Sequence, residues 1–333
     1  MSKLRLSLAC WDYDRTRAIQ DGRVQPDGID LNFIPLRVEE IFFRQLRHRE
    51  FDVAEMSLSS YVMTLSDEKP PFIAIPVFPS KFFRHGNIYI NRNSGIDSPA
   101  DLVGKKVGVA EFQMTAGVWQ RGVLAEEYGV PVDSVTYWTG GVDQPGRIEK
   151  LPLDLPDNLS VTAIPTDRTL SDMLEKGEID ALMAAVAPSS FLRRTAESPV
   201  TRLFPDYVEV EQDYYRRTGI HHIMHTVVIR RDVYDADPWV AQSLVKAFEE
   251  AKQLVYADLV ETGALKYMLP WSVAEAERTR EIFGTDDFWS YGLEPNRRTL
   301  VKFLEYSKDQ GLAKRHYEPE ELFAPESLEA WKK

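Results

Sequence analysis

Through the first half of the chain, short apolar runs alternate with amphipathic segments. The runs have the length of buried strands, and the segments between them carry helical periodicity. The predicted strands cover residues 4–9, 29–34, 53–56, 73–77 and 88–90, and the clearest helices between them cover residues 38–47 and 58–65. This order is typical of a mainly parallel sheet with helices on both faces, so we expect an α/β fold.

A second unit of the same kind begins at Ser98, which is expected to cap a helix with Pro99 in its first position. Residues 106–110 follow as a predicted strand. Residues 115–128 are predicted to form a helix that ends at Gly129. The β-α-β order of the first unit is therefore expected again in the second.

The last third of the chain changes character after a strand predicted from Thr226. Residues 238–259 are predicted to form one long helix. A further helix is expected to open at Ser272, which has the spacing of a capping box with Glu275. A chain that builds one lobe, crosses to a second, returns and ends in helices predicts a hinged clamshell with a ligand cleft between its lobes.

We expect residues 1–92 and 223–333 to form lobe 1, and residues 93–222 to form lobe 2. A weak internal repeat is consistent with two lobes of one kind. Residues 49–62 and 177–190 both read as a polar turn, an aspartate, a short apolar strand and small hydroxyl residues. Chance similarity of two strand ends explains this repeat equally well.

The net charge of the chain limits the classes of partner that it is expected to bind. The net charge is −12 over 333 residues, and the sequence pI is about 5.1. Nucleic acids and anionic membranes bind clustered Lys and Arg, so neither is expected as the main partner. A single cysteine, Cys10, excludes an internal disulfide framework and a cysteine-rich metal site.

The first ten residues superficially resemble a lipoprotein signal, because a basic residue and several leucines precede Cys10. The apolar stretch is too short for such a signal and is interrupted by Arg5. Alternation of Leu4, Leu6 and Leu8 predicts a first strand instead. We therefore expect a cytoplasmic protein.

Several motifs together resemble the 4,5-dihydroxyphthalate decarboxylase family, which is built on the type II periplasmic-binding-protein fold. The most specific are "YDRTRAIQDGRV", "FRHG" and "WTGGVDQPGR", and the resemblance runs nearly end to end. "FDVAEMSLSSY", "GKKVGV", "GEIDAL" and "IMHTVVIRRDVY" add to it. The resemblance implies a two-lobed clamshell, each lobe a mainly parallel sheet flanked by helices.

The resemblance also implies a substrate, an aromatic ring with two adjacent carboxylates and two hydroxyls. Its non-oxidative decarboxylation yields protocatechuate and CO₂, a step of phthalate-type aromatic catabolism. Loss of CO₂ needs a proton at the ring carbon, a polarised phenol and an anchor for the carboxylate that stays. No electron-sink cofactor is required, so we expect none, with a divalent metal left open.

The alternative function is that of a non-catalytic cytoplasmic binding protein for a small aromatic or dicarboxylate anion. Whether the protein forms a homo-oligomer is also left open.

Residues that directly follow strands are the first candidates for this site, because those loops meet the ligand in parallel α/β folds. Arg15 is expected to anchor a carboxylate, with Asp14 orienting it or polarising a phenol. A solvated first helical turn explains both residues as well.

Glu55 lies in an apolar strand, where a carboxylate has a raised pKa unless it is paired, as a catalytic acid or base requires. The alternative places Glu55 on a wet edge.

Ser57 and Ser59 follow Glu55 and are expected to bind an anion or to cap the next helix. In "KFFRHG", Arg84 is expected to hold a carboxylate while His85, titrating near neutral pH, moves a proton. The alternative is that both side chains bond to loop carbonyls.

Lobe 2 adds three further candidates for substrate binding. Thr115 is expected at a helix N-terminus, a site suited to anions, although helix capping alone would explain it. Gly141 is expected to let the backbone wrap a ligand, and Arg147 to supply a cation.

His225 is predicted as a second proton carrier near the hinge. His221 and His225 also suggest a metal pair, but in an extended segment they lie too far apart for easy chelation.

Overall fold

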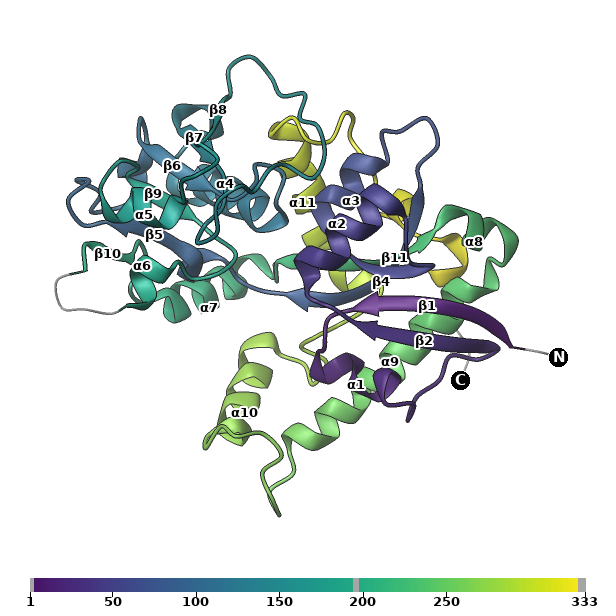
Figure 1. Cartoon of the computed structure of the whole chain (residues 1–333). Helices are drawn as coiled ribbons and strands as arrows, with labels where there is room; N and C mark the ends of the chain where they lie inside the picture. Colours follow the sequence, from purple (N-terminus) through teal and green to yellow (C-terminus); the bar gives the residue numbers. More distant parts are fainter. Residues whose placement is uncertain (1–2, 194–197, 329–333) are drawn as a thin grey trace. The chain divides into compact units, whose positions relative to one another are not determined.

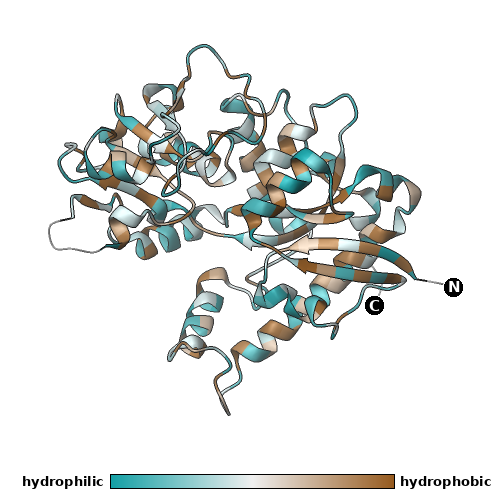
Figure 2. Ribbon diagram, in the orientation of Figure 1, coloured by the Kyte–Doolittle hydropathy of each residue, from teal (hydrophilic) through white to brown (hydrophobic). Residues whose placement is uncertain are grey.

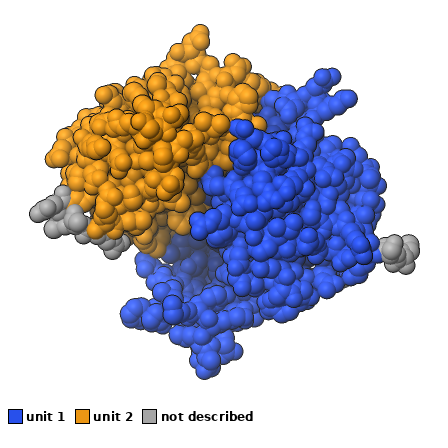
Figure 3. Space-filling view, viewed as in Figure 1, with its two compact units in different colours: residues 1–81, 223–301, 317–333 blue, residues 82–222, 302–316 orange. Residues whose placement is uncertain are grey.

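The structure is a computed structural model and describes residues 3–193 and 198–328. Its chain divides into two compact units. Unit 1 comprises residues 1–81, 223–301 and 317–333, and unit 2 comprises residues 82–222 and 302–316 (Figure 3). Residues 82–92 and 302–316 thus pack with unit 2. The predicted functional lobes and the cleft between them stay predictions.

Unit 1 is built on a five-stranded sheet in the order β2-β1-β3-β11-β4. Its strands are β1 (Leu4–Cys10), β2 (Ile29–Pro35), β3 (Val53–Ser57), β4 (Phe72–Lys81) and β11 (Ile223–Arg230). Strands β1, β2 and β3 are parallel, whereas β11 is antiparallel to both β3 and β4. The predicted strand from Thr226 therefore begins three residues earlier, and it makes the sheet mixed.

Helices cover both faces of the unit 1 sheet. The helices that lie wholly in unit 1 are α1 (Asp14–Gln20), α2 (Val38–His48), α3 (Leu58–Thr64), α8 (Arg231–Ala236), α9 (Trp239–Leu259) and α10 (Ser272–Phe283). In Figure 1, α2 and α3 lie on one face of the sheet and α1 and α9 on the other. Figure 2 shows hydrophobic residues concentrated on the strands between them. All five residues of β3 are buried, as expected for a central strand.

Unit 2 contains a six-stranded sheet in the order β10-β5-β9-β6-β7-β8. Its strands are β5 (Ile88–Asn91), β6 (Lys106–Val109), β7 (Thr136–Thr139), β8 (Ser160–Ala163), β9 (Ala181–Met183) and β10 (Val200–Arg202). Its helices are α4 (Thr115–Tyr128), α5 (Leu170–Glu175), α6 (Ser189–Leu192) and α7 (Tyr207–Thr218), and α11 (Arg297–Asp309) contains the boundary between the units. Strands β6, β7, β8 and β9 are parallel, and β5 and β10 form an antiparallel edge.

Local sequence signals explain most helix ends. Gly129 adopts φ +66° and ends α4, as predicted. Ser98 forms a capping box, although the helix that it caps is a short 3₁₀ helix, Pro99–Leu102. The predicted capping box at Ser272 is wrong: Trp271 precedes α10 and supplies no side-chain cap, so Ser272 is already the first helical residue.

Candidate active site

One edge of the unit 1 sheet collects the ends of several strands. Strands β1, β3 and β4 run in one direction and end there, and the antiparallel strand β11 begins there. This topology brings together three groups of residues that are far apart in the sequence: the segment after β1, β3 with the first turn of α3, and the start of β11. Asp14, Arg15, Glu55, Ser57, Ser59 and His225 all belong to these segments.

Glu55 is the centre of this arrangement and is fully buried. Its carboxylate accepts hydrogen bonds from the Tyr13 hydroxyl at 2.6 Å and from the Trp11 backbone N–H at 2.9 Å. It also lies 2.6 Å from Nδ1 of His225, which comes from β11. The Cys10 thiol donates to Oε2 at 3.6 Å, so four groups from two distant segments converge on one side chain.

The charge state of Glu55 follows from these contacts. Burial raises the pKa of Glu55, but the hydrogen bond and charge of His225, with the bonds from Tyr13 and Trp11, outweigh it. The net pKa of Glu55 lies below its ordinary value, so the carboxylate is ionised. Glu55 is thus a buried carboxylate whose pKa is not raised because it is paired, one of the two possibilities considered from the sequence. It is not a protonated acid near neutral pH.

An ionised carboxylate fixes the orientation of the neighbouring imidazole. Nδ1 of His225 must donate its hydrogen to Glu55, which leaves Nε2 as the nitrogen available to another molecule. The side chain of His225 is 15% exposed, and its ring meets the edge of Phe42 at a centroid distance of 4.9 Å. Burial and the Glu55 charge raise the pKa of Tyr13, so its hydroxyl stays protonated and remains a donor.

Arg15 lies beside this cluster. Its guanidinium carbon is 4.2 Å from the ring centroids of both Tyr13 and Trp289. Nε donates to the backbone oxygen of Pro79 at 2.6 Å, and Nη1 donates to Asp14 at 2.9 Å. These contacts hold the guanidinium plane in place while using two of its about five N–H groups.

The two serines after β3 have different environments. Ser57 caps α3 by accepting the N–H of Ser60 at 3.4 Å, so the capping alternative is confirmed for Ser57. Ser59 is fully buried in the first turn of the same helix. A role of either serine in substrate binding stays a prediction.

In unit 2, Arg84 and His85 precede β5 and are both buried. Nη1 of Arg84 donates to the backbone oxygen of Ala185 at 3.0 Å, a contact of the kind that the carbonyl alternative describes. Burial lowers the pKa of Arg84 to about 10, which leaves it charged at neutral pH.

His85 lies among aromatic side chains, with Phe204 and Tyr214 at ring-centroid distances of 5.4 and 5.3 Å. Neither of its ring nitrogens has a hydrogen-bond partner within the described part of the chain. Burial, helped by the charge of Arg217, lowers the pKa of His85 to about 4. His85 is therefore neutral at pH 7 rather than titrating there, and contact with a substrate stays a prediction.

The remaining candidates also lie in unit 2. Thr115 is buried in the first position of α4. A Cβ on Gly141 would lie 1.6 Å from the backbone oxygen of Gln144, so this tight loop requires glycine. Arg147 is paired with the buried Glu111, its Nε 2.7 Å from the carboxylate. These contacts account for the residues structurally and leave their predicted binding roles untested.

Glu211 gives a prediction about pH and stability. Burial raises its pKa to about 7, although Glu211 accepts the Gly86 N–H at 3.0 Å. A carboxyl whose folded pKa lies above its unfolded value stabilises the fold at low pH, and this contribution is lost as pH rises from about 4.5 to 7. Glu211→Gln keeps an acceptor for Gly86 without the charge.

We therefore expect Glu211→Gln to be more stable than the parent by about 1–3 kcal/mol at pH 8 and little changed at pH 4.5. Urea unfolding at both pH values measures the difference. Equal stability differences at the two pH values would contradict the assignment. Glu209→Gln, on the same helix, is the matched control.

Across residues 3–193 and 198–328, no group of three or more His, Cys, Asp or Glu side chains is placed to hold a metal ion. Over the same residues, no helix is both long and apolar enough to cross a membrane.

Solved structures of low sequence identity share the fold. Protein AF1704 from Archaeoglobus fulgidus matches with a TM-score of 0.52 and 16% identity, covering 92% of this chain and 98% of that one. The periplasmic aliphatic sulphonate-binding protein SsuA from Escherichia coli matches with a TM-score of 0.52 and 11% identity, covering 97% and 98%. The predicted fold class, a two-lobed periplasmic-binding-protein-like α/β protein, is confirmed.

Curated relatives are much closer in sequence. The chain is 43% identical over 332 residues to a 4,5-dihydroxyphthalate decarboxylase from Comamonas testosteroni, covering 100% of both chains. It is 45% identical over 216 residues to a 4,5-dihydroxyphthalate decarboxylase from Pseudomonas putida, covering 65% of this chain and 83% of that one. The scan against family models gave no match. The chain belongs to the 4,5-dihydroxyphthalate decarboxylase family.

Proposed function

We propose that this protein is a carboxy-lyase that converts 4,5-dihydroxyphthalate to protocatechuate and CO₂ without oxidation. The full-length 43% identity to a decarboxylase of that name carries the proposal. The buried Glu55–His225 pair supports it, because it places an oriented imidazole at a sheet edge beside a guanidinium. The reaction needs a proton carrier and an anion anchor in one site.

The chemistry sets the order of events. One substrate carboxylate leaves as CO₂, and the carbon that carried it must gain one proton. The hydroxyl para to this carbon donates electron density into the ring, so the carbon becomes basic enough to accept the proton. Cleavage of the carbon–carboxylate bond then returns its electron pair to the ring and restores aromaticity.

His225 is the proposed proton donor through Nε2. Protonated His225 carries a positive charge, which the ionised Glu55 stabilises through the 2.6 Å contact to Nδ1. After transfer, the imidazole is neutral and regains its proton from solvent before the next turnover. Tyr13 helps to keep Glu55 in place by donating to Oε1, the same carboxylate oxygen that contacts Nδ1, while the Trp11 N–H donates to Oε2.

Arg15 is the proposed anchor for the carboxylate that stays on the ring. Its guanidinium is positioned by Pro79, Asp14 and two aromatic rings, so little side-chain freedom is lost when an anion binds. Arg84, His85, Ser57, Ser59, Thr115, Gly141 and Arg147 remain proposed contributors to substrate binding or proton transfer.

The proposed setting is the cytoplasm, in the breakdown of phthalate-type aromatic compounds. Residues Leu4–Cys10, which superficially resemble a lipoprotein signal, form strand β1, and Cys10 is fully buried. This placement supports the reading of these residues as part of the folded domain. Cell fractionation with a specific antibody tests the location.

The direct test is incubation of purified, chelator-treated protein with 4,5-dihydroxyphthalate, with CO₂ release and protocatechuate absorbance followed together. We expect stoichiometric formation of both products. Saturable binding without turnover, with or without added divalent metal, would contradict the proposal and favour a binding protein for small aromatic dicarboxylates.

A further inference from the structure

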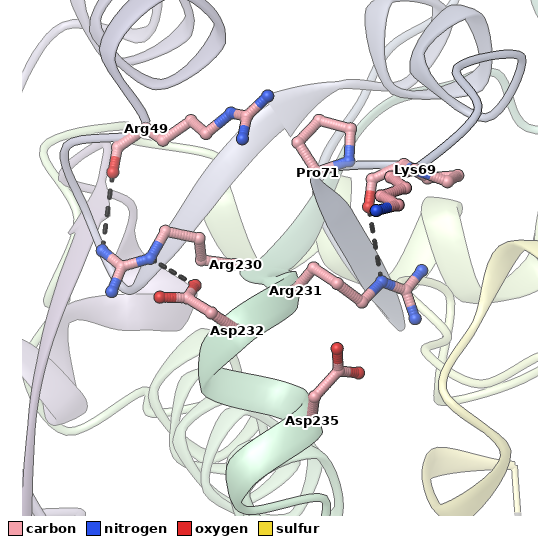
Figure 4. Close-up of a pocket in the computed structure, with 8 residues that line it drawn as sticks. Arg49, Lys69, Pro71, Arg230, Arg231, Asp232 and Asp235 are labelled. Carbon is pink, nitrogen blue, oxygen red and sulfur yellow. Dashed lines mark hydrogen bonds and ion pairs between the residues drawn. The ribbon is translucent and has the colours of Figure 1, made fainter.

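A basic pocket lies in unit 1, at the opposite edge of the sheet from Glu55 and His225. It has a volume of about 500 Å³, which is the size of a small-molecule site. Figure 4 shows its lining, which consists of Arg49, Lys69, Pro70, Pro71, Arg230, Arg231, Asp232 and Asp235. Arg230 ends β11, the same strand that carries His225 near its start, so the two sites are separated by roughly 17 Å of strand.

The charges in this pocket are unevenly matched. Arg230 is paired with Asp232 at 2.6 Å and with Asp52 at 3.3 Å. Among the residues that the structure describes, Arg231 donates only to backbone oxygens, those of Pro70 at 3.4 Å and Phe72 at 3.1 Å. Backbone carbonyls position a guanidinium without cancelling its charge.

The side chains of Arg49 and Lys69 make no hydrogen bond or ion pair with any described residue. Four cationic side chains therefore line the pocket together with two carboxylates, and Arg230 is already paired with Asp232 and with Asp52 beside the pocket. In a chain with a net charge of −12, this is a local excess of positive charge, which attracts a small anion.

The backbone that presents Arg49 is unusual. Arg49 is the one non-glycine residue with positive φ, at +50°, in the described part of the chain, and it follows the C-terminus of α2. Glycine or asparagine normally occupies such a position. Gln45, which is buried, bonds both backbone groups of Phe51 at 2.9 Å, and Arg230 donates to the Arg49 backbone oxygen at 3.5 Å. These hydrogen bonds fix the backbone of the turn on both sides of Arg49. The turn therefore keeps an arginine at a backbone conformation that glycine would adopt with less strain.

We propose that this pocket binds a small dianion, with Arg49, Lys69 and Arg231 supplying the charge. Guanidinium groups bind both phosphate and carboxylate through paired hydrogen bonds, so a phosphate monoester and a dicarboxylate share the required chemistry. Asp235, in the same pocket, limits the charge that the site accepts and disfavours larger polyanions. The proposal is independent of the decarboxylase activity.

The test is isothermal titration calorimetry of the full chain with two probes, inorganic phosphate and the non-aromatic dicarboxylate succinate, at low ionic strength. The key variant is Arg49→Gly, because it removes the guanidinium and places glycine at a φ that suits it. Its melting temperature should be unchanged or higher, so loss of binding cannot result from unfolding. Lys69→Gln is the second variant.

Arg47→Gln is the matched control, since Arg47 lies on the same helix over the Phe43 ring and does not line the pocket. Saturable binding of either probe that Arg49→Gly weakens at least about tenfold, and Arg47→Gln leaves unchanged, supports the proposal. Phosphate alone would identify a phosphate-type ligand, and succinate alone a dicarboxylate. No saturable binding of either probe, or binding that Arg49→Gly and Lys69→Gln leave intact, would overturn it.

Discussion

Replacement of His225 by asparagine is expected to reduce kcat by about 10²–10⁴-fold, the usual contribution of a positioned proton donor. The asparagine amide can still donate to Glu55, so the buried carboxylate keeps a partner and the fold is retained. It cannot deliver a proton to a ring carbon. Steady-state kinetics with 4,5-dihydroxyphthalate measure the loss, and binding of the substrate should change much less than kcat.

The same replacement at His85 separates the two histidines proposed for proton transfer. His85 is neutral at pH 7 and enclosed by aromatic rings. We therefore expect His85→Asn to lower the free energy of unfolding clearly and to change kcat only slightly. A loss of turnover in His85→Asn with full activity in His225→Asn would reverse the assignment.

Glu55→Gln is expected to have an effect of similar size, about 10²–10⁴-fold in kcat, without removing any group that contacts substrate. The glutamine amide no longer stabilises a protonated His225. Its NH₂ group can also donate to Nδ1, which would hold the imidazole neutral with its hydrogen on Nε2 and oppose formation of the protonated ring that donates to substrate. The pH dependence of kcat should shift together with the loss of activity.

Tyr13→Phe is the matched control for Glu55→Gln. It removes one hydrogen bond to the carboxylate but keeps the charge and the contact to His225. We expect a loss of no more than about tenfold in kcat. Equal losses in the two variants would mean that the hydrogen-bond network, rather than the carboxylate charge, controls the reaction.

The α/β order of the chain could be predicted because strand length and helical periodicity are local signals. The helix Thr115–Tyr128 and the helix ending at Leu259 agree with the prediction at those boundaries. Strand β11 was harder, because its first residues, Ile223–His225, lie in a histidine-rich stretch without clear alternation. Its antiparallel pairing with β3 and β4 depends on the whole sheet and has no local signature.

The candidate site could be located from sequence but not assembled. Glu55 was identifiable as a carboxylate in an apolar strand, and Arg15 as a residue after a strand. Their convergence with His225, which is 170 positions from Glu55, required the sheet order. Trp289, which stacks on Arg15, was missed because nothing in its surrounding sequence indicates an approach to the end of β1.

The central claim is that an ionised Glu55 holds the hydrogen on Nδ1 of His225. Nitrogen-15 NMR of the histidine side chains tests it, with the His225 signals assigned by their loss in His225→Asn. We predict a protonated Nδ1 in the parent protein across the active pH range, and loss of this state in Glu55→Gln. An Nδ1 without hydrogen in the parent, with the proton on Nε2 alone, would contradict the account.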